Sequence, residues 1–157
     1  MSASLSDRLT IREGRVQDLE SIVRLHQDDT LGGLEDAWSS ETCAAYEAAF
    51  AAIAASADNT VYVAELEGRV VGTFQITVVP TLTGLGATRV RIGAVQVAAD
   101  LRSKGIGARM IAFAEEAGRA RGARSVELSS NKRRTDAHRF YERIGYARSH
   151  EAFKKRL

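Results

Sequence analysis

The chain of 157 residues has 22 Lys and Arg against 20 Asp and Glu, 45% hydrophobic residues and one cysteine, Cys43. This composition fits one folded domain and excludes a disordered chain, an internal disulfide and a cysteine-rich zinc site, while three scattered histidines argue against any metal site. The N-terminus lacks signal-peptide features and no apolar run is long enough for a bilayer, so we expect a cytoplasmic protein with no membrane partner.

Hydrophobic periodicity divides the first half of the chain into a strand, two helices and a hairpin. These elements are a strand at Arg8–Glu13, helices at Val16–Asp28 and Glu41–Ser56 with a loop at Thr30–Ser40 between them, and strands at Val61–Leu66 and Val70–Val79. Gly32 and Gly33 indicate the loop, and Pro80, which cannot donate to a sheet, ends the last of these strands. His26 falls on the apolar face of the first helix, where we expect a packed or half-exposed residue rather than a ligand.

The second half alternates strands and helices after a glycine-containing connection. The predicted elements are a mobile connection at Thr81–Thr88, strands at Val90–Ala98 and Ser125–Ser130, and helices at Gly105–Gly122 and Thr135–Ile144. Gly145 is placed to end the last helix as its C′ residue, and the tail Tyr146–Leu157 can supply a final strand. The order β-α-α-β-β-β-α-β-α-β predicts an α/β domain with a mixed sheet.

Charge is distributed unevenly along the chain. Residues 1–79 hold five basic and thirteen acidic side chains, whereas residues 80–157 hold seventeen basic and seven acidic ones. A basic half favours a polyanionic ligand, either a phosphate-bearing cofactor or a nucleic acid. Aromatic residues are only 6% of the chain and are not interleaved with the basic ones, so we expect no nucleic-acid partner. An anion-binding or nucleic-acid-binding module stays the alternative from a different class.

The segment Arg102–Ala108 joins a predicted strand to a predicted helix and contains two glycines. Free N–H groups at a helix start bind anions, glycines allow close approach of phosphate, and Arg102 and Lys104 add positive charge. These features predict a pyrophosphate cradle. A Walker loop does not fit because Lys104 precedes Gly105, and Met110 weakens a dinucleotide fingerprint by replacing its third small residue. A glycine turn that binds nothing is the remaining alternative.

Two motifs resemble those of the GNAT superfamily of N-acetyltransferases. Arg102-x-x-Gly105-x-Gly107 is similar to the acetyl-CoA motif of that family, Gln/Arg-x-x-Gly-x-Gly/Ala. The run from Ala137 to Tyr146 is similar to its second signature, Ala-x-x-Phe/Leu-Tyr-Glu-x-x-Gly-Phe/Tyr. The resemblance covers residues 8–157 and implies a single N-acetyltransferase domain over 1–157, with a mixed, mostly antiparallel sheet flanked by helices.

The resemblance also implies acetyl-CoA as cosubstrate and a role for each matching residue. The residues implied to bind it are Val95, Gln96, Val97, Arg102, Ser103, Lys104, Gly105, Ile106, Gly107, Ala108, Asn131 and His138. The strand residues would pair through their backbone with the pantetheine arm, and the N–H of Val97 would donate to the thioester carbonyl. Residues 103–108 would hold the pyrophosphate. Asn131 would replace an asparagine that many relatives carry where this chain has Arg134.

Tyr141 matches the usual general acid of the family, which protonates the departing thiolate, and no metal is required. The implied reaction transfers acetyl to a primary amine by direct attack in a ternary complex. Relatives often use an acidic base where this chain has Gly93, Ala94 and Ser129. We therefore expect no single acidic residue to be the essential base. Glu127 is the remaining acidic candidate, and a water chain or an amine that is already deprotonated are the alternatives.

The acceptor side is implied to involve Gln27–Glu41 and Thr81–Thr88. The first of these segments is acidic and contains Trp38, which suits a small cationic amine, and a protein amine is the second acceptor class. An exposed acidic loop without a ligand is the alternative for that segment. An acyl-CoA-binding domain with little catalysis is the alternative function within the fold, and the resemblance leaves a homodimer open.

Overall fold

The computed structural model describes residues 5–31 and 35–157. Its elements in chain order are η1 Leu5–Arg8, β1 Thr10–Glu13, η2 Val16–Asp18, α1 Leu19–Gln27, α2 Cys43–Ala54, β2 Asn59–Leu66, β3 Arg69–Pro80, α3 Thr83–Gly86, β4 Thr88–Val97, η3 Ala99–Leu101, α4 Ile106–Ala120, β5 Ser125–Leu128 and α5 Thr135–Arg143. Within those ranges the strands form one sheet in the order β1-β2-β3-β4-β5, antiparallel except for the β4–β5 pair. The fold class predicted from the sequence is therefore confirmed.

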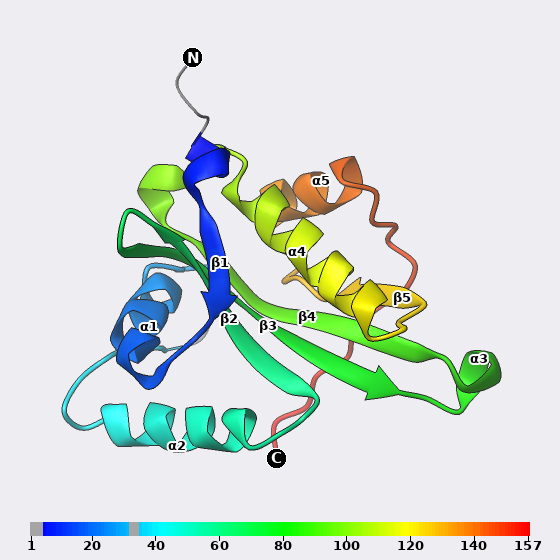
Figure 1. Cartoon of the computed structure of the whole chain (residues 1–157), viewed down its shortest axis with the longest axis horizontal. Helices are drawn as coiled ribbons and strands as arrows, with labels where there is room; N and C mark the ends of the chain where they lie inside the picture. Colours follow the sequence, from blue (N-terminus) through cyan, green and yellow to red (C-terminus); the bar gives the residue numbers. More distant parts are fainter. Residues whose placement is uncertain (1–4, 32–34) are drawn as a thin grey trace.

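Helices cover both faces of the sheet (Figure 1): α1 and α2 lie on one side, and α4 and α5 lie on the other. The core forms where α4 packs on the central strands, with Phe74, Ile92 and Met110 almost completely buried. Gly72 permits this close approach, because a Cβ at that position would lie 2.7 Å from the sulfur of Met110. The central strands and α4 thus share one buried core, to which Leu25 of α1 also belongs.

A three-residue ion-pair network attaches the start of α1 to the sheet. Arg12 on β1 donates from Nη1 and Nη2 to the carboxylate of Asp18 at 2.7 and 2.9 Å, and from Nη2 to Glu65 on β2 at 2.8 Å. The hydrogen bonds from Arg12 outweigh the effect of burial and lower the pKa of Asp18. The paired geometry positions α1 against the sheet edge.

The C-terminal tail departs from the prediction. The final strand expected within Tyr146–Leu157 is wrong, since the structure forms no strand over these residues. Phe153 and Leu157 are almost fully exposed, so the tail gains no apolar burial to offset the entropy of ordering it. The connection 81–88 contains the short α3, and residues 32–34 of the predicted loop, including Gly32 and Gly33, lie outside the described residues.

Candidate active site

Strand β4 is incompletely paired toward its C-terminal end. It pairs with β5 only over Arg89–Ile92, and β5 ends at Leu128 while β4 continues to Val97. On its other side a bulge places Ala94 and Val95 opposite one residue of β3, with Ala94 at a φ of +51°. Within the described residues, β4 beyond Ile92 therefore presents an edge that β5 leaves unpaired.

Val97 directs its backbone polar groups toward this edge. The N–H of the next residue, Ala98, donates to the carbonyl of Val71 on β3 at 2.8 Å. Because successive residues of a strand direct their N–H groups to opposite sides, the N–H of Val97 faces away from β3. Its carbonyl accepts a hydrogen bond from Nε of Arg102 at 3.2 Å on that side. The strand end and the glycine-containing loop are thereby joined at the open edge.

The loop before α4 has the backbone geometry of an anion site. Ser103 and Gly105 adopt φ values of +61° and +84°, and α4 begins at Ile106. The first N–H groups of a helix have no acceptor within the helix, so those of Ile106, Gly107 and Ala108 are directed out of its end. The side chains of Ser103 and Lys104 are exposed. This arrangement can receive a phosphate from solvent.

Gly107 brings α5 against the same helix end. A Cβ at Gly107 would lie 3.4 Å from Cζ of Phe140, which is ordinary van der Waals contact, so the ring of Phe140 packs on the glycine backbone. Phe140 in turn makes an edge-on contact with Tyr141, with ring centroids 5.1 Å apart. The two sequence motifs are therefore in direct contact through Gly107 and Phe140.

The end of α5 holds Tyr141 in place. Gly145 has a φ of +102°, its N–H donates to the carbonyl of Glu142 at 3.1 Å, and the N–H of Tyr146 donates to the carbonyl of Tyr141 at 2.9 Å. These two bonds form a Schellman motif, with Gly145 at C′ as the sequence predicts, and Tyr146 packs on Tyr141. Burial raises the pKa of Tyr141 against an opposing effect of Arg134, so its hydroxyl is protonated at neutral pH.

The structure also brings Asn131 and His138 together. Nε2 of His138 lies 2.9 Å from the backbone carbonyl of Asn131, and the side-chain oxygen of Asn131 accepts the N–H of Arg133 at 3.0 Å. Both contacts stabilise the turn that leads from β5 into α5. These two predicted residues therefore shape the turn between the end of β5 and the start of α5.

A polar link across three elements was missed by sequence reasoning. The buried side chain of Gln96 donates from Nε2 to Asp29 at 2.8 Å, and Arg134 forms an ion pair with the same carboxylate. Burial alone would raise the pKa of Asp29. The hydrogen bond and charge of Arg134, together with the hydrogen bond from Gln96, outweigh burial and lower this pKa overall, so the carboxylate stays charged. The available signal was Gln96 itself, because a polar side chain between apolar strand neighbours needs a buried partner.

A cavity of about 150 Å³ lies between α1, α2 and the sheet. Its walls are mostly apolar, and Ala94 borders it from the bulge of β4. The polar side chains that line it are His26, Asp36, Tyr46, Thr73 and Gln75. The hydroxyl of Tyr46 donates to Asp36 at 3.0 Å, and the ring of Trp38 stacks on that of Tyr46 with centroids 6.0 Å apart. The predicted acidic segment thus contributes Asp36 to the cavity wall, and its Trp38 packs on Tyr46 of α2.

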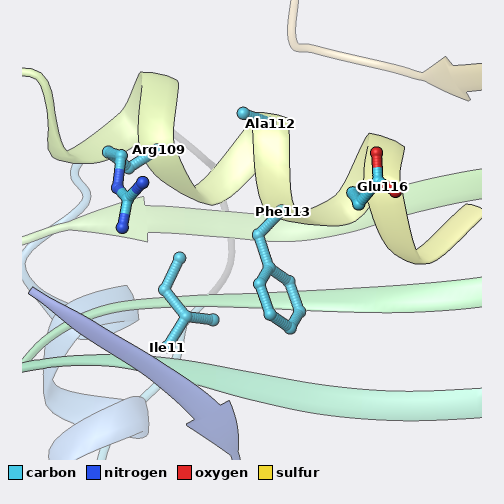
Figure 2. Close-up of a pocket in the computed structure, with 5 residues that line it drawn as sticks. All are labelled: Ile11, Arg109, Ala112, Phe113 and Glu116. Carbon is cyan, nitrogen blue, oxygen red and sulfur yellow. The ribbon is translucent and has the colours of Figure 1, made fainter.

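A second, open hollow of about 360 Å³ lies between α4 and β1. Figure 2 shows Arg109 and Phe113 extending from α4 toward Ile11 on β1. It contains none of the predicted site residues and does not reach the bulge of β4. Over residues 5–31 and 35–157 no cluster of side chains suits a metal ion, and no helix there has the length and hydropathy of a membrane span.

Comparison with known proteins decides the family. The profile of the Acetyltransferase (GNAT) family matches residues 19–146, which include the bulge, the loop before α4 and all of α5. The chain belongs to the GNAT family of acetyltransferases. Members of this family are acyltransferases that use acetyl-CoA.

Individual proteins share part of the sequence or the fold of this chain. The chain is 48% identical over 69 residues to an aminoalkylphosphonate N-acetyltransferase of Salmonella typhimurium, a match that spans 42% of this chain and only 45% of that protein. A structure titled as a transcriptional regulator from Bacillus halodurans is 35% identical, with a TM-score of 0.91 over 95% of this chain and 99% of that one. An aminoglycoside N-acetyltransferase in complex with CoA is 16% identical and shares the fold, with a TM-score of 0.76 over 95% and 94% of the two chains.

Proposed function

We propose that this acetyltransferase transfers acetyl from acetyl-CoA to a small primary amine by direct attack in a ternary complex. The observation that carries the proposal is the position of β4 between two binding regions. Ala94 borders the cavity beneath α1 and α2, while Val97, three residues further on, faces the open edge next to the loop before α4. A donor bound at the edge and an acceptor bound in the cavity would meet at the bulge.

The donor side would be formed by the backbone. Val95, Gln96 and Val97 would pair with the pantetheine arm, with the N–H of Val97 donating to the thioester carbonyl. The N–H groups from Ser103 to Ala108 would hold the pyrophosphate. Arg102, Lys104, Asn131 and His138 complete the proposed set of binding residues. When bound, acetyl-CoA supplies an activated acyl group, so the protein needs only to orient it and to manage protons.

Tyr141 would act as the general acid. Its hydroxyl is protonated at neutral pH because burial raises its pKa, and the Schellman motif fixes the backbone that carries it. A phenol held in this way can donate its proton to the sulfur as the C–S bond breaks. The sulfur leaves more readily as a thiol than as a thiolate. Packing of Phe140 on Gly107 sets the distance between Tyr141 and the donor loop.

The cavity favours a small amine with an apolar body. Its apolar walls suit a hydrocarbon chain, and Asp36 with the Trp38–Tyr46 pair provides an anion and aromatic faces for an ammonium group. A volume of about 150 Å³ suits a small molecule better than a protein amine. The Salmonella relative, named for aminoalkylphosphonates, makes a zwitterionic primary amine the second class to test.

A thiol-release assay tests this proposal. Purified protein is mixed with acetyl-CoA and, separately, with n-butylamine, putrescine, 2-aminoethylphosphonate or a lysine-containing peptide. We expect amine-dependent thiol release with intersecting double-reciprocal lines, and at least about tenfold higher kcat/KM for the small amines than for the peptide. Parallel lines would contradict the ternary complex. Binding of acetyl-CoA without release for any amine would favour the acyl-CoA-binding alternative.

A further inference from the structure

His26 differs from the other two histidines in its surroundings. His138 contacts the carbonyl of Asn131, and His150 contacts the hydroxyl of Ser149, whereas the ring of His26 has no hydrogen bond to another described residue. His26 lies on the sheet-facing side of α1 and lines the cavity that Ala94 borders. An unpaired imidazole is thus placed within the proposed acceptor cavity.

The acidic side chains around this cavity each have a hydrogen-bond or ion-pair partner, and one oxygen of Asp36 has no partner among the described residues and can bind an ammonium group. Asp36 accepts the hydroxyl of Tyr46 at 3.0 Å, and Asp29 binds Arg134 and Gln96. Glu127, the acidic candidate from the sequence, accepts Nη2 of Arg91 at 2.8 Å on an exposed part of the sheet. Unlike these carboxylates, the imidazole of His26 lines the cavity without a hydrogen-bond partner among the described residues.

The charged groups that face His26 come from three elements. Asp36 in the loop before α2 and Asp29 after α1 raise its pKa, Arg134 at the start of α5 lowers it, and the larger effect of burial lowers it below 6.5 overall. The imidazole is accordingly neutral at pH 7 and can accept a proton.

The same groups locate His26 relative to the reacting centre. Asp29, three residues beyond His26, binds the side chain of Gln96 on β4, so the end of α1 is tied to the strand that carries the bulge. Arg134 acts on the pKa of His26 and also on that of Tyr141. His26 and Ala94 line the same cavity, so His26 faces β4 from the α1 side, whereas α5, which carries Tyr141, lies on the other side of the sheet (Figure 1).

We propose that His26 is the base of the acetylation reaction; this inference rests on the proposed function. A bound ammonium group transfers one proton to the imidazole of His26, which becomes imidazolium. The freed nitrogen lone pair attacks the thioester carbonyl carbon, a C–N bond forms, and the C–S electron pair leaves on sulfur. Tyr141 gives its proton to that sulfur and is reprotonated by the second nitrogen proton, while the imidazolium releases its proton to solvent. The products are the N-acetylamine, free CoA thiol and one proton.

The pH dependence of His26→Asn tests this role. Wild type and His26→Asn are compared with n-butylamine, at saturating acetyl-CoA, from about pH 6 to about pH 9. Wild-type kcat/KM should decrease only at the acidic end, where the imidazole becomes protonated. The variant depends on amine deprotonated in solvent, so its kcat/KM should be about 10²-fold lower at pH 7 and should recover by about tenfold per pH unit. Added imidazole should partly rescue His26→Ala.

Controls separate this role from a structural one. His150→Asn, which changes an exposed histidine in the tail, should match wild type at every pH. Acetyl-CoA affinity, measured by calorimetry, should be the same in His26→Asn as in wild type. A uniform loss at all pH values, or no loss, would overturn the role of His26 while leaving the proposed function standing. If wild type releases no thiol with any amine, both proposals are overturned.

Discussion

The two sides of β4 are built in different ways. The proposed donor side consists of short contiguous segments, residues 102–108 and 137–146, whose geometry depends on backbone conformation and on a contact between Gly107 and Phe140. The proposed acceptor side is assembled from α1, α2 and three strands, and Asp29 next to it bonds to residues 67 and 105 positions away.

This difference matches the different demands of the two ligands. A pyrophosphate is bound by backbone N–H groups and a helix end, which a short motif can provide. An acceptor amine is selected by the shape and charge of a cavity, which only the packing of distant elements can create. Variation in α1 and α2 can therefore change the acceptor without altering the donor site.

The largest of the mutational effects is expected where the two sides meet. Tyr141→Phe removes the proposed acid but retains the ring that packs on Phe140 and Tyr146. We expect kcat to fall about 10²-fold, equivalent to about 2.7 kcal/mol in the barrier, with unchanged affinity for acetyl-CoA. Tyr62→Phe, in the aromatic cluster with Phe74 and Phe113, should leave kcat unchanged. Equal kcat values for Tyr141→Phe and wild type would remove Tyr141 from the reaction.

The attachment of α1 should be the next most sensitive feature. Asp18→Asn removes the charge that binds Arg12 and should lower the free energy of unfolding by about 1–3 kcal/mol at pH 7. Because the folded-state pKa of Asp18 is lowered, its contribution is present above the unfolded pKa of about 3.9 and is lost as the pH falls toward the folded value.

Urea unfolding at neutral and acidic pH checks this prediction. The stabilities of wild type and Asp18→Asn should converge as the pH is lowered through this window. Asp58→Asn, which changes an exposed ion pair with Arg121, should have an effect of less than about 1 kcal/mol. A constant difference between wild type and Asp18→Asn at every pH would show that charge is not what attaches α1.

The end of α5 should show a smaller effect on stability. Gly145→Ala places a side chain at a φ of +102°, which disfavours the Schellman motif by about 1 kcal/mol. Thermal unfolding should detect this loss. Gly93→Ala is the matched control, because its Cβ would also enter open space but its φ is not positive. Equal losses in the two variants would mean that backbone conformation at Gly145 is unimportant.

The smallest expected effect lies on the exposed surface of α1. Glu20 and Arg24 form an ion pair of spacing i,i+4, with both side chains more than half exposed. Glu20→Gln should change stability by at most about 0.5 kcal/mol, and less in high salt. A larger loss of stability, measured by urea unfolding, would show that this exposed ion pair contributes more to α1 than its exposure predicts.

Most of the fold could be predicted because its elements have clear local patterns. The hairpin, its end at Pro80 and the C′ position of Gly145 follow from turn chemistry and hydrophobic periodicity. Local patterns could not predict whether a final strand forms within residues 146–157. Whether residues 146–157 add to a sheet depends on burial against neighbours, and Phe153 remains exposed.

The candidate site also has parts that local sequence patterns predict and parts that they do not. The loop 102–108 and Tyr141 could be found from motifs, because their backbone geometry is encoded within a few residues. The link from Asp29 to Gln96 and Arg134 could not, since it joins residues far apart in the sequence. His26 was expected to be a packed or half-exposed helix residue, and it is half-buried. Only the fold shows that it also lines a cavity bordered by the bulge of β4.

Calorimetric titration with acetyl-CoA tests the central claim most directly. Gly105→Glu places a carboxylate and a side chain at a φ of +84° in the proposed phosphate site, and Gly68→Glu makes the same change at a φ of +81° in the β2–β3 turn. Wild type and Gly68→Glu should bind with micromolar affinity, and Gly105→Glu should bind at least about 100-fold more weakly. Absence of binding to wild type at moderate salt, or equal binding to both variants, would contradict the account.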